Sequence, residues 1–442
     1  MDDTHEIPAT YRPSRPGSDR SNGSGPRPRP KPRPRLHARR GRIYRRRRIW
    51  AVIWVVLTVF VIWLVISLGS ALTNPTYGTS LSARFAEWAR QNGGASLVNS
   101  IENYWYTHHP PKVGGTVPHG AIVVHGSTPT TVPAAAPPHL PAPTNIVPLA
   151  SPALPGEGVW SAAGRPVGGI PAVYTTQLRP DAIHTSYVVG VAWMDMPLLH
   201  ATLYSGSQIP GGGPFVHSAP VTPTAATALV SAFNAGFLMS AANGGYYTDG
   251  KTLIPLRNGA ASAVIYANGS MTVADWGRDA TLTSNVVAVR QNLDLIVDGG
   301  QPVPGLNAND TTQWGATLGN AVYVYRSGLG VTANGALVYV GGPGLNITDL
   351  ATLLIRAGAV RGMELDINTD WVNYSFYTPV PADGPATAQN GSLLLPQMLG
   401  TAGRYFAPYW ARDFFTMSAA YPPTATSSTT ATTTPRSTSS SG

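Results

Sequence analysis

Arg361-Gly-Met-Glu-Leu-Asp-Ile-Asn-Thr-Asp-Trp-Val-Asn-Tyr374 alternates apolar and polar residues over its first half. A period of two predicts a β-strand, here with one apolar face formed by Met363, Leu365 and Ile367. The opposite face carries a dense polar row: Glu364, Asp366, Asn368 and Asp370. Asp and Asn are depleted from strands because their side chains compete for backbone hydrogen bonds. The row is therefore either a functional site or a strand face turned to solvent, and the local pattern favours neither.

A calcium loop is the first alternative for this row. The order Asp366-Ile-Asn368-Thr-Asp370 matches the start of an EF-hand loop. Trp371 stands where that loop needs Gly, and Tyr377 stands where it needs the terminal Glu. We therefore reject an EF-hand and predict no metal site and no cofactor.

Residues 158–416 have the pattern of a folded domain. Strand-like runs recur at 187–193, 263–266, 286–289, 293–297, 321–325, 336–340 and 362–367. Two helices are predicted, over 222–233 with Pro223 near its start and over 348–357 with Thr348 as its cap. Turn dipeptides such as Asn268-Gly269 indicate hairpins. We predict an α+β domain with a largely antiparallel or mixed sheet and a few helices.

The basic charge of the chain is concentrated at its N-terminus. The chain of 442 residues has a formal charge of +9, and residues 1–48 hold 15 Lys and Arg against 4 Asp and Glu. The remaining residues hold 15 Lys and Arg against 17 Asp and Glu, so they offer no charge argument for a nucleic-acid partner. The Pro-, Gly- and Arg-rich composition of 1–48 predicts a disordered cytoplasmic tail.

Residues 49–72 contain no charged side chain and are rich in Val, Ile, Leu and Trp. As a helix they reach about 36 Å, enough to cross a bilayer. Arg45–Arg48 precede this run and no basic residue follows until Arg84, which predicts a cytoplasmic N-terminus and an extracytoplasmic C-terminal domain. We therefore predict a single-pass protein of the cell membrane with a signal-anchor helix.

Three further segments complete the predicted organisation. Residues 73–112 form a juxtamembrane stem, in which apolar residues at helical spacing predict two short amphipathic helices. Residues 113–157 are rich in Pro, Ala and Thr and predict an extended linker, and the Ser/Thr-rich residues 417–442 predict a disordered tail. Cysteine is absent, which excludes disulfides, thiolate ligands and a cysteine nucleophile. Neither a Gly-x-Ser-x-Gly elbow nor a Walker loop is present.

Two kinds of polar residue in the domain are candidates for binding. Asn234 lies in Ala232-Phe-Asn-Ala-Gly-Phe237, where its amide could bond sugar hydroxyls or phosphate oxygens, or where Gly236 could simply end a helix. Asn243 opens a Gly-rich loop suited to carbohydrate. Three arginines at strand ends could hold a phosphate or form surface salt bridges: Arg257, Arg290 and Arg326.

Three segments in order resemble the phosphodiester glycosidase family in a membrane-anchored, actinobacterial form. They are Phe233–Phe237, then the strand and glycine turn from Thr317-Leu-Gly319 to Arg326, then the helix at Thr348 leading to Glu364-Leu-Asp366. The resemblance covers residues 222–367. It implies hydrolysis of the bond between a sugar's anomeric carbon and a phosphodiester, with Asn234 and Asp366 matching the family's Asn and Asp.

The chain departs from the family pattern at two places. Ile367–Asp370 stands where the family has glycines and a Ser, and Trp314–Gly319 stands where it has an Arg before its turn. A loop without glycine keeps backbone amides farther from phosphate, so the site has been rebuilt or has lost activity. A rebuilt site would use Asp366 with Asp370 as carboxylates and Arg290 or Arg326 on phosphate.

The sequence thus predicts a glycosidase acting on a sugar 1-phosphodiester of cell-envelope glycans. The candidate catalytic residues are Asp366, Asn234 and Asp370. The candidate substrate-binding residues are Arg257, Arg290, Arg326, Asn368 and Asn243. The alternative is a non-catalytic cell-wall carbohydrate-binding or structural module on the same fold.

Overall fold

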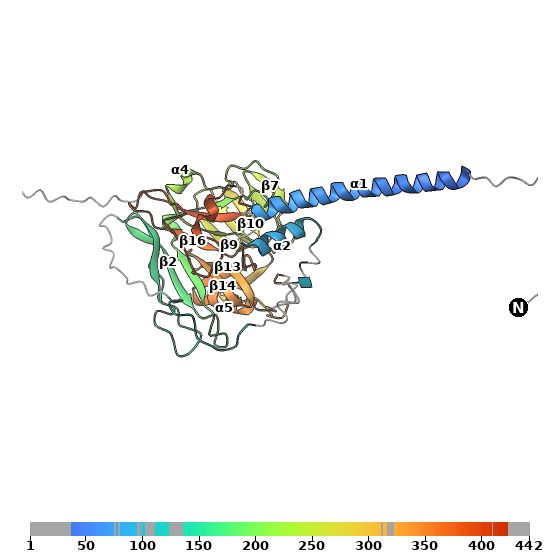
Figure 1. Ribbon diagram of the computed structural model, residues 1–442. Coiled ribbons are helices and arrows are strands. Elements are labelled where there is room, and N and C mark those ends of the chain that lie inside the picture. The colour runs from blue at the N-terminus through green and yellow to red at the C-terminus, as the bar shows by residue number, and fades with distance from the viewer. Residues whose placement is uncertain are drawn as a thin grey trace, which may run out of the picture. The chain divides into compact units, whose positions relative to one another are not determined.

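The structure is a computed structural model, shown in Figure 1. It describes residues 37–74, 77, 80–94, 98, 100–101, 111–122, 136–310, 313–315, 322–408 and 410–422. The two predicted disordered ends lie mostly outside these ranges, as do most of the second stem helix, linker residues 123–135 and the segment Thr317–Gly319. The chain divides into two compact units, residues 1–65 and 66–442.

Helix α1 (His37–Thr73) contains the one described segment that is long and apolar enough to span a membrane, Arg45–Thr73. Its Trp, Val and Ile side chains are exposed to an unusual degree, including Trp54 at 66% and Ile66 at 67%. The Thr58 hydroxyl donates to the Trp54 carbonyl at 2.8 Å, which satisfies this polar group within the helix. An apolar helix that satisfies its backbone and hydroxyl groups internally is suited to a bilayer.

Helix α2 (Leu81–Gln91) follows, capped by the Ser80 hydroxyl, which accepts from the Ala83 backbone N–H. Its apolar residues recur at helical spacing, which confirms the first of the two predicted stem helices. Ala89 on this helix is buried.

All strands of the domain lie in three antiparallel sheets, which confirms the predicted α+β class. The large sheet has the order β1 (Ser161–Val167), β2 (Ile170–Leu178), β3 (Val189–Met194), β14 (Leu337–Leu345), β13 (Val324–Thr332), β15 (Ala359–Glu364), β11 (Leu295–Asp298) and β12 (Gln301–Pro302). Helix α5 (Ile347–Arg356) follows β14 and matches the predicted helix over 348–357. Its cap is Asn346, two residues before the predicted one.

Two five-stranded sheets complete the domain. One has the order β7 (Lys251–Ile254), β6 (Tyr246–Thr248), β10 (Val286–Gln291), β8 (Ala261–Tyr266) and β9 (Met271–Asp275). The other has the order β17 (Gly391–Leu393), β16 (Tyr374–Tyr377), β5 (Leu229–Asn234), β18 (Phe414–Ala419) and β4 (Leu199–Tyr204). The largest buried cluster takes residues from all three sheets, so they share one core.

The predicted helix over 222–233 is wrong. Only Pro223–Ala226 is helical (α4), and Leu229–Asn234 is strand β5, whose six residues are all buried. Its neighbours β16 and β18 cover both edges, pairing Phe233 with Tyr374 and with Phe415. Tertiary pairing therefore overrides the helical propensity of this Ala-rich run.

The stretch that begins at Arg361 is a strand only to Glu364, where β15 ends. Beyond it, Asp366 and Asn368 form successive turns: the Asp366 carboxylate accepts from the Asn368 backbone N–H, and the Asn368 side chain accepts from the Asp370 backbone N–H, both at 2.9 Å. The predicted strand over 362–367 is therefore too long, because Asp and Asn satisfy the backbone locally. The solvent-facing alternative is also wrong at Glu364 and Asp366, which are 0% and 5% exposed.

Glycines on the large sheet let α5 lie close to it. A Cβ at Gly328 would meet the Leu350 side chain at 3.1 Å, and a Cβ at Gly362 would meet Leu354 at the same distance. Both leucines are fully buried. The helix thereby packs against β13, β14 and β15 and holds the strands that lead to the site.

We expect Leu354→Ala to destabilise the domain by about 2–5 kcal/mol, because it removes a fully buried side chain over a glycine surface that cannot fill the space. Chemical denaturation of the purified chain measures this loss. Ile355→Ala, at a half-buried position of the same helix, is the control and should cost less. Equal losses for the two variants would contradict this packing.

Candidate functional site

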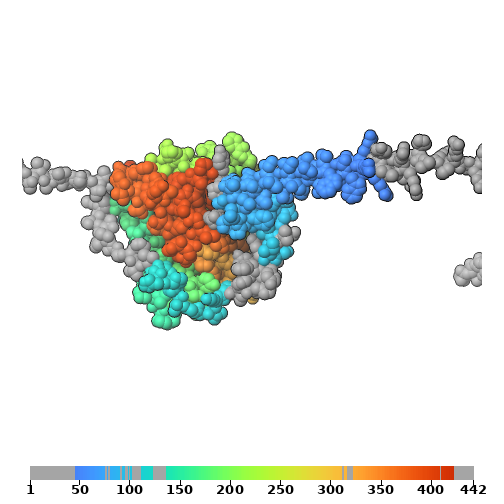
Figure 2. All heavy atoms as spheres, in the orientation of Figure 1, coloured from blue at the N-terminus to red at the C-terminus, as the bar shows by residue number. Residues whose placement is uncertain are grey.

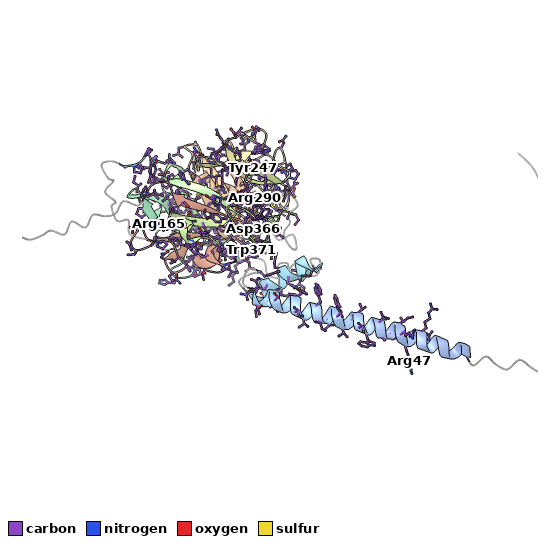
Figure 3. The ribbon with its side chains drawn as sticks, turned by 90° about the horizontal axis from the view of Figure 1, so that it is seen from above. Arg47, Arg165, Tyr247, Arg290, Asp366 and Trp371 are labelled. Carbon is purple, nitrogen blue, oxygen red and sulfur yellow. The ribbon has the colours of Figure 1, made fainter. Side chains whose placement is uncertain are left out.

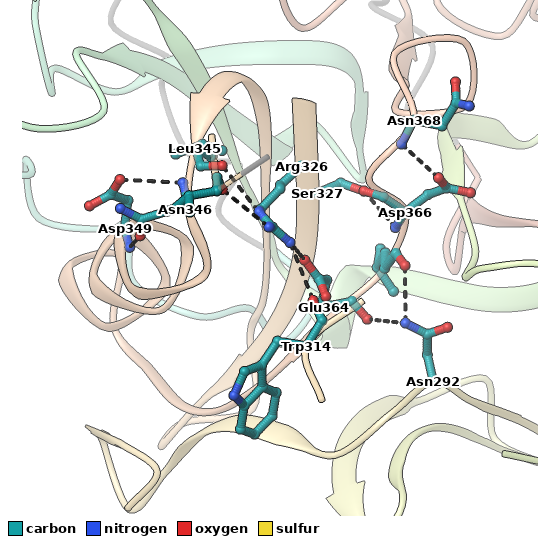
Figure 4. A network of polar contacts seen from close by, with 12 residues as sticks. Asn292, Trp314, Arg326, Ser327, Leu345, Asn346, Asp349, Glu364, Asp366 and Asn368 are labelled. Atoms are coloured by element: carbon teal, nitrogen blue, oxygen red, sulfur yellow. Dashed lines mark hydrogen bonds and ion pairs between the residues drawn. The ribbon is translucent and has the colours of Figure 1, made fainter. Parts of the chain in front are cut away.

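The polar site lies where the three sheets meet. β13 and β15 of the large sheet supply Arg326, Ser327 and Glu364; β10 supplies Arg290; β5 supplies Asn234; and Asp413 directly precedes β18. All six residues are at most 6% exposed. Segments distant in sequence thus bring charged and amide groups into one buried cluster, part of which is drawn in Figure 4.

Ser327 joins Asn234 to Asp366. The Asn234 side-chain amide donates to the Ser327 hydroxyl oxygen at 3.0 Å, and the Asp366 backbone N–H donates to the same oxygen at 3.1 Å. The Ser327 hydroxyl and backbone N–H both donate to the Asp366 carbonyl. The structure therefore brings together Asn234 and Asp366, two of the three predicted catalytic residues.

The Asn234 amide is satisfied entirely by the protein. Its oxygen accepts from the Tyr339 hydroxyl at 2.8 Å and from the Asn373 backbone N–H at 3.1 Å. Its nitrogen also donates to the Ala235 carbonyl. A group with this many internal bonds fixes the positions of its neighbours, as buried polar networks do.

The Asp366 carboxyl is held in an environment that favours its protonated form. Burial raises its pKa to about 6, and the nearby Asp413 carboxylate adds to the rise. The Arg412 guanidinium and the N–H groups of Asn368 and Ile367 oppose it. A carboxyl with such a pKa can accept and return a proton near neutral pH.

Arg326 is tied to Glu364. One guanidinium nitrogen lies 2.5 Å from a Glu364 carboxylate oxygen, and Nε donates to the Leu345 carbonyl at 3.1 Å. The remaining donors contact the carbonyls of Trp314 and Val322. Burial raises the pKa of Glu364 to about 7 against the effect of Arg326, with the Asp366 carboxyl adding to the rise. The second Glu364 oxygen, Oε2, is buried and has no hydrogen-bond partner.

Arg290 forms a matching pair with Asp413. Its Nε lies 2.7 Å from Asp413 Oδ2, and its other nitrogens donate to the carbonyls of Gln291 and Phe237. A Cβ on Gly236 would lie 3.0 Å from the guanidinium carbon, so only glycine allows this approach. The other Asp413 oxygen, Oδ1, is buried without a partner. Arg290 and Arg326, two of the three predicted phosphate-binding arginines, therefore each hold a carboxylate in place.

The remaining predicted residues lie at the edges of this cluster or beyond it. Asn368 and Asp370 follow Asp366 in the turn loop, and the Asp370 carbonyl accepts from Arg404 at 3.0 Å. Arg257 is partly exposed, lies 2.5 Å from Asp294 and donates to the Asn243 carbonyl. The structure links Arg257 and Asn243 to each other but shows no contact between them and Asp366. All predicted site residues remain predictions as to their roles.

Sequence reasoning missed Ser327, Asn292, Arg412 and Asp413. Asn292 bridges Phe237, whose N–H it accepts at 3.0 Å, to the carbonyls of Glu364 and Leu365. A charged pair inside an aromatic run is a usable signal for Arg412-Asp413, since such charges are rarely buried without a partner. Among the described residues no group of three or more His, Cys, Asp and Glu could hold a metal ion.

Arg412 stacks on an indole. Its guanidinium carbon lies 4.4 Å from the ring centroid of Trp371, which contacts Trp410 edge to face at 5.4 Å. Trp371 is 4% exposed and its backbone N–H donates to the Asn368 carbonyl in the loop that begins at Asp366. Figure 3 labels Asp366, Trp371 and Arg290 in the domain.

No protein-family model and no curated protein matches the chain. Among solved structures, it is similar to the catalytic domain of zebrafish N-acetylglucosamine-1-phosphodiester alpha-N-acetylglucosaminidase, auto-inhibited by its pro-peptide, with 14% identity and a TM-score of 0.36 over 59% of this chain and 87% of that one. It is also similar to a hypothetical protein from Synechocystis, with 13% identity and a TM-score of 0.33 over 57% of this chain and 63% of that one. A third similar structure is a putative exported protein from Burkholderia pseudomallei, with 12% identity and a TM-score of 0.26 over 52% of this chain and 74% of that one. These are distant similarities of fold.

We expect the buried Asp366 carboxyl to make folding depend on pH. Its pKa is about 6 in the folded chain and ordinarily 3.8, so the folded state binds the proton more tightly. Its contribution to stability is present below pH 4 and is lost as pH rises through 6, by about 3 kcal/mol in total.

Urea unfolding of the wild type and of Asp366→Asn at pH 4.5 and pH 8 measures this dependence. The wild type should lose stability relative to the variant as pH rises, while Asp298→Asn, at a partly exposed carboxylate, should track the wild type. A stability difference between wild type and Asp366→Asn that is the same at both pH values would contradict the raised pKa.

Proposed function

We propose that the chain is an extracytoplasmic glycosidase that hydrolyses a sugar 1-phosphodiester bond in cell-envelope glycans. Helix α1 would anchor it in the cell membrane, with Arg45–Arg48 keeping the N-terminus in the cytoplasm. The single observation that carries the proposal is the buried Asp366, whose backbone is joined through Ser327 to Asn234 and whose carboxyl has a pKa of about 6. The order of the motifs around Asn234 and Asp366 supports the same activity.

The chemistry suits these groups. Water forms a bond to the anomeric carbon while the bond from that carbon to the phosphate oxygen breaks, and its electron pair leaves with the phosphate. A phosphodiester is a good leaving group, so it requires little help from an acid. At pH 7 the ionised Asp366 takes a proton from the attacking water or stabilises the positive charge that develops on the sugar.

Asn234 has a positioning role in this proposal. Its amide is used by Ser327, Tyr339 and backbone groups, so it acts on Asp366 through Ser327. Arg290 and Arg326 likewise orient the carboxylates of Asp413 and Glu364, each of which keeps one unpartnered oxygen for a ligand. Sugar hydroxyls are natural donors to such oxygens.

A specific observation favours the second candidate, a non-catalytic envelope-binding module. Arg290 and Arg326, the two predicted phosphate-binding arginines that lie in the buried cluster, are fully engaged with carboxylates and carbonyls. A module of this kind would retain wall polysaccharide in a pull-down without changing it. Sugar release that depends on Asp366 would exclude it.

The test is the release of free sugar from synthetic sugar 1-phosphodiesters by the purified chain. We expect Asp366→Asn to reduce kcat by about 10²–10⁴-fold with little change in KM, because the amide can neither accept the proton nor stabilise positive charge. Asp298→Asn is the matched control and should leave turnover unchanged. Undiminished turnover by Asp366→Asn, or no turnover of any such substrate by the wild type, would remove the proposal.

A further inference from the structure

A carboxylate from helix α2, which lies outside the three sheets, reaches the edge of the site. Glu87 of helix α2 lies 3.7 Å from an Arg412 guanidinium nitrogen, and the two residues are 5% and 7% exposed. Figure 2 shows the blue atoms of α2 beside the red atoms of the C-terminal segment. A charged residue of a surface helix is rarely buried unless it meets an opposite charge.

The surroundings of Arg412 suit an anionic ligand. The guanidinium carbon lies over the Trp371 ring, and the NH1 atom is buried without a hydrogen-bond partner. It is close enough to Asp366 to oppose the rise in the pKa of that carboxyl. An arginine stacked on an aromatic ring is preorganised to bind carboxylate or phosphate through two donors.

The distance between Glu87 and Arg412 is longer than that of the two ion pairs at the site. At 3.7 Å the pair is an ion pair that is too long for a hydrogen bond, whereas Arg326–Glu364 and Arg290–Asp413 are 2.5 and 2.7 Å apart. The two short pairs join residues of the three sheets and their loops, and the long pair joins Arg412 to helix α2. A phosphate oxygen could approach Arg412 more closely than Glu87 does.

We infer that Arg412, supported by Trp371, forms the phosphate subsite of this site, and that Glu87 occupies that subsite from helix α2. The inference rests on the proposed function, because it assigns the phosphodiester group of that substrate. The ligand class is a phosphate mono- or diester whose anion replaces the Glu87 carboxylate. The sugar attached to that anion would then lie toward Asp366, whose loop carries Trp371.

The test is the binding of inorganic phosphate to the full chain in detergent, measured by titration calorimetry at low salt. Glu87→Ala should lower the dissociation constant by about tenfold, because the competing carboxylate is gone. Adding Arg412→Gln to Glu87→Ala should raise it again by at least that factor. Asp298→Asn removes a carboxylate from the ion pair with Arg278 and is the matched control, which should bind like the wild type.

Arg412→Gln could instead weaken folding, so thermal unfolding is recorded for each variant and Arg412→Lys in the Glu87→Ala background provides a second reading. Lysine keeps the charge without the two-donor geometry, and binding between that of Arg and Gln is expected. Unchanged phosphate affinity in Glu87→Ala, or full affinity in folded Glu87→Ala/Arg412→Gln, would overturn the inference.

Failure of this inference is distinguishable from failure of the proposed function. Phosphate binding does not require turnover. Arg412-dependent phosphate binding without sugar release would therefore support the phosphate subsite and exclude the glycosidase activity. If sugar release depends on Asp366 but is unchanged by Arg412→Gln in the Glu87→Ala background, the glycosidase activity is supported and the phosphate subsite is excluded.

Discussion

The centre of this fold depends on one constraint: charged side chains that are buried away from water must be paired with opposite charges and hydrogen-bond acceptors. Arg326, Arg290 and their partners Glu364 and Asp413 are at most 1% exposed, and an isolated charge at such a position costs several kcal/mol. Each arginine therefore needs a carboxylate and several carbonyls at once. Those acceptors lie on β10, β14 and β15 and in the loops beside them, so the packing of these elements has to supply all of them together.

This constraint also explains the chemistry available at the site. Each pair uses one carboxylate oxygen and leaves the other, Glu364 Oε2 and Asp413 Oδ1, buried without a partner. Fully satisfied networks hold a core in place, whereas leaving a buried oxygen unsatisfied costs free energy that a ligand can recover. Arg290 and Arg326 thus act on carboxylates instead of on phosphate, whereas Arg412 NH1 is buried without a hydrogen-bond partner, as are the Nε atoms of Arg165 and Arg404.

The sequence predicts elements well where one periodicity dominates. Helix α5, with its apolar spacing, and strands such as β10 and β8 follow the local pattern closely. It fails at β5, where an Ala-rich run is a buried strand because β16 and β18 pair with both of its edges. It also fails beyond Glu364, where the Asp366 and Asn368 side chains replace the sheet as backbone partners.

The candidate site shows the same division between local and distant information. Asn234 and Asp366 were found from motif order, and they share the Ser327 oxygen across 93 and 39 positions of sequence. Ser327 itself carries no local signal, because a serine beside an arginine in a strand is ordinary until two other strands place their amide groups against it. A residue whose role is to join distant segments can be recognised only when the partners are known. In the polar row that begins at Glu364, Asp366 therefore stands out because of its contacts with Ser327 and, through Ser327, with Asn234. Those partners lie in distant parts of the sequence, so the row itself does not reveal them.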